Sequence, residues 1–448
     1  KKIFQYIMLA VVTIVMASCT SDIEEPTATT GKSNVQLVVG EFPAFGDSQT
    51  RAIGTPDEGK TSWAEGDELL LVIDNTFYGK QYATFTYNDK SWKLTSGELV
   101  YREGDPAYIP HVYYAPNYKW EAGKLVLKEG KVAGTDEYIE GNARITGNDE
   151  TITVSFAGAT RKYSRLRIAT LPNEQITVDT EYFTPAGSSD MEQEGNYTLT
   201  SDEKGNAYLY GTFENNSEVT VKYREAALTT YTFSQATESA KSYALDATVI
   251  SANSAEEIKS AIKQKVADGK TTIRLNLAPN AGTDEFMAIR EAIKGAAPND
   301  EGTIELTIIG VETIPEEAFK RMSQLKSVKM PDVKEIKKYA FSECIYLTVV
   351  EAPSLNKLNS GAFNKCNLLS KLTFGPINYA DARYWPIFED ITPNIDLILS
   401  DYQKEMIETD DDLYTANNDI DYALSPEHRD KKFLGYEFKS ITCRYKFE

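Results

Sequence analysis

Two patterns of apolar and polar residues divide the chain. From Asn34 to about Asp246 the two kinds of residue alternate with a period of two, as in the run Val35, Leu37 and Val39. Gly, Asn, Asp and Pro interrupt these runs at short intervals, and no long stretch here has the spacing of a helix. Short strands with frequent turn residues are typical of a sandwich or a barrel. We therefore predict an all-β module over this part of the chain.

The pattern changes near Ser251. Apolar residues recur with helical spacing over 254–266 and again over 284–294, and a short run typical of a strand, 271–277, lies between them. Gly and polar residues follow both helical stretches. We predict a helix, a strand and a second helix that together cap the module that follows.

Apolar residues then recur every 22 residues over about 304–376, most clearly in the three Ala-Phe pairs that begin at Ala318, Ala340 and Ala362. A fixed period of this length predicts a solenoid, because one unit cannot bury its own apolar edge and must stack on its neighbours. The positions that we assign to the repeat core are Ile314, Ala318, Phe319, Leu325 and Val328; Ile336, Ala340, Phe341, Leu347 and Val350; and Leu358, Ala362, Phe363, Leu369 and Leu372.

The repeat unit, Ile-x3-Ala-Phe-x5-Leu-x2-Val, resembles the BspA-like leucine-rich repeat of surface antigens. The resemblance implies a short α/β leucine-rich-repeat solenoid within a domain that spans 251–448. The stretch from Asp396 to Ile441 is expected to cap its second end. Cys344 and Cys366 occupy equivalent places in two units, so we expect small buried core residues there. A disulfide between adjacent rungs is the alternative.

Short phrases in the first module resemble the fimbrillin-like family, which is related to type V pilins and Mfa-like proteins. These phrases are Thr50-Arg51-Ala52, the stretch Thr61 to Asp67, the stretch Tyr113 to Pro116, and the stretch from Val154 to Ile168. The resemblance implies two transthyretin-like sandwiches, over 34–150 and 151–248. The predicted fold class is therefore mixed and multidomain, with all-β sandwiches followed by the solenoid.

Members of that family serve as pilus subunits, pilus tips or surface adhesins. In polymerising relatives a cut after an Arg near the first strand opens a groove, and a strand of a neighbouring subunit fills it. Arg51 is the candidate for such processing in this chain. The alternative is that Arg51 is an ordinary loop residue and the first strand stays in place.

The N-terminus carries a basic pair, Lys1-Lys2, an uncharged apolar run to Met16, and then small residues before Cys19. The run is too short for a comfortable membrane span, which needs about 20 residues, and it suits a secretory signal. Met16 to Cys19 resembles the lipobox of bacterial lipoproteins, with Met in place of the usual Leu. The resemblance implies a signal peptide over 1–18, palmitate-type acylation at Cys19 and an acidic tether over 19–33. The alternatives are an ordinary signal peptide and a generic linker.

By that resemblance the protein is an outer-membrane lipoprotein that faces the cell exterior and touches the membrane only through its lipid anchor. The chain has 47 Lys and Arg against 67 Asp and Glu, a net charge of −20. Such a charge repels phosphate backbones, so nucleic acid is not an expected partner.

Residue patterns for catalysis or cofactor binding are weak. Gly54 to Thr61 matches the spacing of a P-loop, but no apolar strand precedes it and no helical pattern follows, so we reject nucleotide binding. The two His residues, His111 and His428, lie in different modules, which disfavours a triad or a zinc site. The stretch 410–421 is rich in side-chain oxygen atoms of the kind that bind calcium. A solvated acidic loop is nevertheless the interpretation that we favour for it. We expect no enzyme activity, no cofactor and no metal.

The expected function is that of a surface adhesin or a pilus-associated accessory protein, whose partner is a host or bacterial surface protein or a pilus subunit. A purely structural subunit that anchors or ends a pilus is a further interpretation. The runner-up is a glycan-binding lipoprotein of a nutrient-uptake system, since 27 Tyr and 4 Trp offer stacking surfaces. Residues between the repeat core positions are candidates for the contact surface: Lys326, Ser327, Lys329, Thr348, Glu351 and Lys371.

Overall fold

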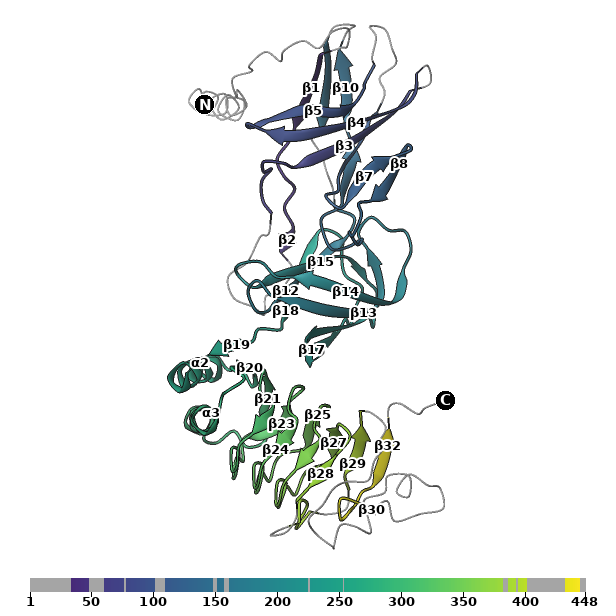
Figure 1. Cartoon of the computed structure of the whole chain (residues 1–448). Helices are drawn as coiled ribbons and strands as arrows, with labels where there is room; N and C mark the ends of the chain where they lie inside the picture. The colour runs from purple at the N-terminus through teal and green to yellow at the C-terminus, as the bar shows by residue number, and fades with distance from the viewer. Residues whose placement is uncertain are drawn as a thin grey trace, which may run out of the picture. The chain divides into compact units, whose positions relative to one another are not determined.

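The structure is a computed structural model, and strands dominate it (Figure 1). It describes residues 34–47, 60–75, 78–100, 109–147, 151–156, 161–224, 226–252, 254–381, 386–391, 394–400 and 432–443. The chain divides into two compact units, of which the first holds 1–45 and 57–162 and the second holds 46–56 and 163–448. The β-rich, multidomain fold class with repeats towards the C-terminus is confirmed.

Two sheets enclose the core of the first unit. One has the strand order β5-β4-β3-β6-β9 and the other the order β1-β11-β10, and a separate hairpin joins β7 to β8. Their bounds are β1 (Asn34–Val39), β3 (Glu68–Asn75), β4 (Gly79–Asn88), β5 (Ser91–Gly97), β6 (His111–Tyr114), β7 (Tyr118–Glu121), β8 (Lys124–Leu127), β9 (Ile139–Asn142), β10 (Arg144–Gly147) and β11 (Thr151–Phe156). Alternate residues such as Leu69, Leu71 and Phe85 fill the space between the sheets.

The strand β1 lies at an edge and runs parallel to β11, in register from Asn34 opposite Thr151 to Val39 opposite Phe156. Its apolar residues pack against the core only in part, and Val38 points outward with 56% of its surface exposed. An edge strand of this kind has one partner for its backbone instead of two.

The strand β11 corrects the predicted boundary between the sandwiches. The predicted second sandwich begins at residue 151, but β11 pairs with β1 and β10 of the first unit. Its buried residues Ile152, Val154 and Phe156 belong to the first core. Alternation along a sequence shows which face of a strand is apolar but not which strand is its neighbour, so the boundary was placed too early.

A second sandwich opens the second unit, with the strand order β17-β16-β13-β15-β12-β18-β2 and β14 paired to β13. Its strands are β2 (Gly46–Asp47), β12 (Ser164–Ala169), β13 (Gln175–Pro185), β14 (Glu192–Thr200), β15 (Asn206–Phe213), β16 (Glu218–Tyr223), β17 (Ala226–Thr232) and β18 (Lys241–Asp246). The long strand β13 pairs with β16 along Thr177–Thr180 and with β15 along Phe183–Pro185. It thereby bends the sheet round a core that includes Phe183 and Phe213.

The predicted helix, strand and helix follow, as α2 (Ala255–Ala267), β20 (Thr272–Leu277) and α3 (Thr283–Ala296), after the short strand β19 (Ile250–Ala252). The side chain of Ser254 accepts the backbone N–H of Glu257 at 3.4 Å and so caps α2. Each helix buries one apolar face, which in α3 includes Phe286 and Ile289. These residues join one continuous core with the repeats.

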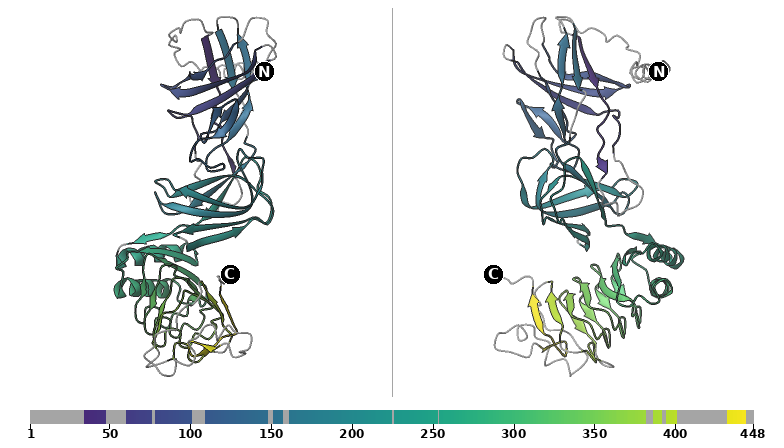
Figure 2. Two further views of the ribbon diagram at one scale, coloured as in Figure 1. Left: turned by 45° about the vertical axis from the view of Figure 1, so that its right-hand side comes forward. Right: turned by 180° about the vertical axis from the view of Figure 1, so that it is seen from behind.

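The solenoid has a long parallel sheet, β19-β20-β21-β23-β25-β27-β29-β32, and a narrow one, β22-β24-β26-β28, whose strands lie side by side in Figure 2. The remaining bounds are β21 (Ile304–Ile309), β22 (Thr313–Ile314), β23 (Leu325–Lys329), β24 (Glu335–Ile336), β25 (Val349–Ala352), β26 (Lys357–Leu358), β27 (Lys371–Phe374), β28 (Tyr379–Ala380), β29 (Asp396–Leu399), β30 (Lys432–Phe433), β31 (Tyr436–Glu437) and β32 (Ser440–Cys443). Each unit places one strand in each sheet and joins them by turns.

Candidate binding surface

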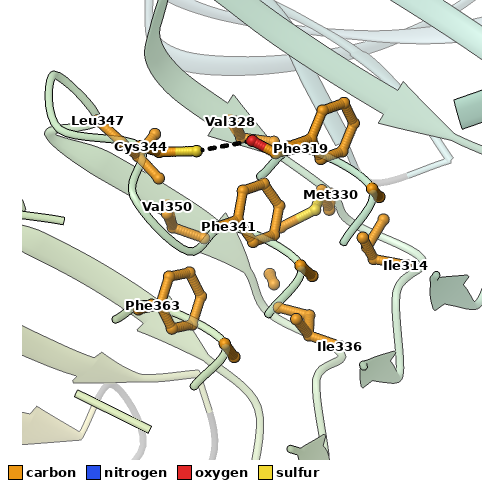
Figure 3. Close-up of a cluster of buried hydrophobic side chains, with 14 of the residues drawn as sticks. Ile314, Phe319, Val328, Met330, Ile336, Phe341, Cys344, Leu347, Val350 and Phe363 are labelled. Atoms are coloured by element: carbon orange, nitrogen blue, oxygen red, sulfur yellow. Dashed lines mark hydrogen bonds between the residues drawn. The ribbon is translucent and has the colours of Figure 1, made fainter. Parts of the chain in front are cut away.

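The interior of the solenoid fixes the geometry of its surface. Every residue that the 22-residue spacing assigns to the repeat core is buried, with at most 6% of its surface exposed. Figure 3 shows Phe319, Phe341 and Phe363 one above the other between the two sheets. Ile314 and Ile336 occupy equivalent places on β22 and β24. Buried side chains of equal size at equal spacing leave successive units little freedom to shift.

The Phe rings form one column. Phe319 and Phe341 stack with centroids 5.2 Å apart, and Phe341 and Phe363 stack with centroids 5.5 Å apart. Phe286 of α3 meets one end of the column edge-on at 5.6 Å, and Phe388 stacks on the other end at 5.7 Å. The spacing follows that of neighbouring strands, about 4.8 Å, and each aromatic pair adds about 1 kcal/mol beyond its burial.

A fourth unit continues the solenoid beyond the repeats that the sequence indicates. Ala380 on β28 continues the 22-residue spacing from Leu358, and its strand pairs in register with β26. Phe388 stacks on Phe363 and follows it after 25 residues. The N–H of Phe363 donates to the carbonyl of Ile387. An equivalent hydrogen bond joins the N–H of Phe319 to the carbonyl of Ala340 in an earlier unit. Three extra residues between positions 380 and 388 break the strict period, which explains why the sequence indicates the repeat only to residue 376.

The turns of the units hold residues in the left-handed backbone region at a regular interval. Two positions recur every 22 residues with φ between 56° and 64°, and the second recurs once more in the fourth unit with a φ of 55°. The first position holds Glu317, Tyr339 and Gly361, and the second holds Arg321, Glu343, Lys365 and Asp390. The side chains at these positions differ from unit to unit, so this feature cannot be predicted from the sequence pattern.

Cys344 and Cys366 are free, buried thiols, as the first of the two interpretations predicted. The Sγ of Cys344 donates to the carbonyl of Phe319 at 3.0 Å, and that of Cys366 to the carbonyl of Phe341 at 3.1 Å. Burial raises the pKa of Cys344 to about 12 and that of Cys366 well above its usual value. Each thiol therefore serves as a small donor between rungs.

The outward side chains of β23, β25, β27 and β29 form a surface that we call the open face. Residues of these strands alternate, so Val328, Val350 and Leu372 point inward and are fully buried. The pairing of the strands places the outward residues in two rows. One row is Ser327, Val349, Lys371 and Asp396. The other is Lys329, Glu351 and Ile398, with Thr373, which is only 4% exposed, between Glu351 and Ile398.

Four of the six candidate surface residues, Ser327, Lys329, Glu351 and Lys371, belong to the open face. Lys326 and Thr348 lie just before it, where the Thr348 hydroxyl donates to the Lys326 carbonyl at 2.8 Å. The structure adds two apolar residues to these rows, Val349 within the first row and Ile398 at the end of the second. Both are partly exposed.

Charged side chains pair from rung to rung. Lys326 meets Glu305 at 2.8 Å, Lys329 meets Glu351 at 3.7 Å, and Arg321 meets Glu343 at 3.0 Å. These pairs are well exposed, and each contributes no more than about 1 kcal/mol. They do, however, neutralise one another within the solenoid. A partner at the open face therefore meets a surface whose charges are largely balanced.

The first strands of the long sheet do not take part in the open face, because the second sandwich covers them. Arg274 on β20 is 7% exposed, and its Nε donates to the carbonyl of Leu228 on β17 at 2.6 Å. Burial lowers the pKa of this guanidinium, while Asp246 and Glu305 oppose the shift. Ile309 on β21 is fully buried in the core of the sandwich.

The remaining predicted sites divide into described and undescribed residues. His111 lies on β6, with Nδ1 at 2.9 Å from Oδ1 of Asn142 and Nε2 at 3.4 Å from Glu140. Cys19, Arg51, the stretch 410–421 and His428 lie outside the described residues, as does most of the P-loop-like phrase. Among the residues that the structure does describe, no group of three or more His, Cys, Asp or Glu is placed to hold a metal ion. Within the same residues, no helix has the length and apolarity needed to cross a membrane.

Several solved structures share features with the chain at low similarity. One is a protein of Bacteroides fragilis provisionally described as a cell-adhesion protein, with 10% identity and a TM-score of 0.32 over 48% of this chain and 93% of that chain. The minor pilin GBS52 of Streptococcus agalactiae has 11% identity and a TM-score of 0.18, over 48% of this chain and 95% of that chain. A leucine-rich repeat protein of Bacteroides thetaiotaomicron has 9% identity and a TM-score of 0.14, over 84% of this chain and 68% of that chain. At these values the likenesses carry no functional argument.

No curated protein matches the chain. A family model described as a BspA type leucine rich repeat region matches residues 303–384, in six copies. The match includes the three units that the sequence indicates and the strands β21 to β28 of the solenoid. Residues 303–384 are therefore a BspA-type leucine-rich-repeat region.

Proposed function

We propose that the chain is a cell-surface lipoprotein that binds a protein partner through the open face, and that it acts as an adhesin or a pilus-associated accessory protein. The observation that carries the proposal is the open face itself, in which in-register side chains of four parallel strands meet on one surface. Its role is binding rather than catalysis. Solenoids offer extended surfaces of this kind to protein partners.

The rigidity of the solenoid favours such binding. The open face rests on a row of fully buried residues, including Val328, Val350 and Leu372, so its backbone is already ordered before a partner arrives. Association then loses less conformational entropy than it would on a loop surface. Val349 and Ile398 supply apolar area between polar neighbours, the usual composition of a binding surface that is also exposed to water.

The proposed anchor is Cys19, acylated after removal of residues 1–18, at the outer membrane and facing the cell exterior. Metabolic labelling with a fatty-acid analogue tests it, because wild-type chain is expected to carry the label and Cys19→Ala to lose it. Protease added to intact cells should digest the labelled protein. An unlabelled wild-type chain, or a labelled chain resistant to external protease, would contradict the anchor or the orientation.

A pilus-associated role is the second part of the proposal. The edge position of β1 and its parallel pairing with β11 make it a strand that another chain could replace. Processing at Arg51 would precede such replacement. Mass spectrometry of protein taken from the cell surface decides the matter. A terminus at Ala52 supports processing, and an intact segment across residue 51 rules it out.

Glycan binding is a second candidate function, and one observation favours it. Tyr82, His111, Tyr113, Trp120 and Tyr138 gather on the first unit, with neighbouring ring centroids 4.6 to 6.0 Å apart. The indole Nε1 of Trp120 is buried and has no hydrogen-bond partner among the described residues. The rings meet at steep angles, however, which suits a small core better than a flat sugar platform.

Parallel binding assays separate the two functions. The full chain is applied to a glycan array and to a panel of immobilised cell-surface and matrix proteins. The main proposal expects saturable binding to a protein with no glycan signal, unchanged by Tyr113→Ala. Saturable glycan binding that Tyr113→Ala removes, with no protein bound, would overturn it in favour of the glycan function.

A further inference from the structure

The short segment that follows β1 has contacts of its own with the first unit. We call residues 40–45 the strap. The N–H of Gly40 donates to the carbonyl of Phe156 at 2.8 Å, and the carbonyl of Gly40 accepts the indole N–H of Trp63 at 2.9 Å. Phe42 is 6% exposed and meets the rings of Trp63 and Tyr114 edge-on, at 4.8 and 5.5 Å. The strap is thus tied by its backbone and by a buried ring.

Arg161 stands at the centre of the contacts that hold the strap. Its Nε and one terminal nitrogen bind the two carboxylate oxygens of Glu137 at 3.1 and 2.9 Å. The other terminal nitrogen donates to the carbonyl of Pro43. The guanidinium also lies 3.9 Å from the ring centroid of Phe45. Every nitrogen of this side chain is therefore in use, two on Glu137 and one on the strap.

Burial makes these contacts strong. The side chains of Arg161 and Glu137 are only 1% and 3% exposed. Removing one member of a buried, hydrogen-bonded pair leaves a charge without water or partner, so such pairs are costly to break. The strap carbonyl of Pro43 is part of the same network. By contrast, Val35, Leu37 and Val39 of β1 are only partly buried, and β1 pairs with one strand among the residues that the structure describes.

We propose that Arg161 and Glu137 form a clamp that keeps residues N-terminal to 46 bound to the first unit after the backbone is cut between residues 48 and 59. The cut is hydrolysis of one peptide bond by a protease, with water as the second reactant. The proposed anchor at Cys19 lies on the N-terminal side of such a cut. On that basis, which rests on the proposed function, the clamp decides whether a processed molecule stays on the cell or leaves it.

The experiment uses the purified full chain with a site for a highly specific protease in place of residues 53–58. After complete cutting, size-exclusion chromatography and intact mass measure how fast the N-terminal fragment leaves. The wild-type clamp should retain the fragment through the column. Arg161→Met should release it about 100-fold faster, as expected for loss of a buried charge pair. The matched control is Arg144→Met, which changes an exposed Arg on β10 of the same sheets and should retain the fragment.

A second variant tests the proposal independently, in case Arg161→Met does not fold. Trp63→Phe keeps a ring but loses the N–H donated to Gly40, and it should release the fragment about tenfold faster. Circular dichroism of each uncut variant must match that of the wild type. Release at the same rate in the wild type, Arg161→Met and Trp63→Phe would overturn the proposal, as would loss of the wild-type fragment on the first column. The assay involves neither lipid nor partner, so its failure is distinct from failure of the proposed function.

Discussion

Lys365 occupies one of the left-handed positions of the solenoid turns, with a φ of 58°. This conformation costs a residue other than Gly roughly 1 to 2 kcal/mol, whereas Gly adopts it freely. Lys365→Gly should therefore raise the free energy of unfolding by about 0.5 to 1 kcal/mol, after the entropy that Gly gains in the unfolded chain is subtracted. Denaturant unfolding of the full chain measures the change.

Lys371→Gly is the matched control for this prediction. Lys371 lies on β27, where Gly weakens the strand and should lower the free energy of unfolding by about 0.5 to 1 kcal/mol. The two substitutions are the same and their effects should have opposite signs. If both destabilise the protein to the same extent, the turns of the solenoid do not have the described backbone.

Cys344 makes the stability of the solenoid depend on pH above about 9. Burial raises the pKa of its thiol from 9.0 to about 12, so the unfolded chain loses this proton before the folded chain does. The stability that the thiol contributes is complete below pH 9 and is lost as the pH rises towards 12. We expect the difference in unfolding free energy between the wild type and Cys344→Ala to shrink from pH 8.5 to pH 11. A constant difference over this range would mean that the thiol is not buried.

Among the elements of the solenoid, the stacked Phe rings keep successive rungs aligned with one another. Phe341 is fully buried between the rings of Phe319 and Phe363, so Phe341→Ala leaves a cavity with two unsupported neighbours. We expect it to lower the free energy of unfolding by about 3 to 5 kcal/mol, and Phe341→Leu to cost less, because Leu fills most of the space. Guanidinium unfolding of the second unit tests this. A loss under about 1 kcal/mol for Phe341→Ala would place the ring outside the core.

The sequence predicts these elements to different degrees. The 22-residue period locates the core of three rungs, and helical spacing locates α2 and α3 to within a few residues. The 22-residue period does not locate the fourth rung, because three inserted residues shift Phe388 out of phase. The assignment of β11 was wrong because the partner of a strand depends on contacts far along the chain, which alternation does not record.

At the scale of the whole molecule, the surface is harder to predict than the core. Core positions follow from periodicity, since each must be apolar and of constant size. The open face follows from strand pairing and from the sandwich that covers Arg274 and Ile309, and neither is visible in the sequence. The clamp cannot be predicted from the sequence either, because nothing in the pattern distinguishes Glu137 and Arg161 from other charged residues before the fold buries both. The role of Cys19 remains a prediction from the N-terminal pattern.

Binding at the open face is the central feature of the proposed function. Val349 lies at its centre, between Ser327 and Lys371, and Val349→Arg places a long charged side chain there without entering the core. Lys357→Asp changes an exposed residue of the narrow sheet and serves as the control. Residues at the centre of an interface commonly dominate its energy.

The deciding measurement is the dissociation constant of the full chain, wild type and both variants, for the protein ligand identified on the panel of cell-surface and matrix proteins. We expect Val349→Arg to weaken binding at least about tenfold, or 1.4 kcal/mol, and Lys357→Asp to bind like the wild type. Undiminished binding by Val349→Arg would show that the partner binds elsewhere and would contradict the proposed function of the open face.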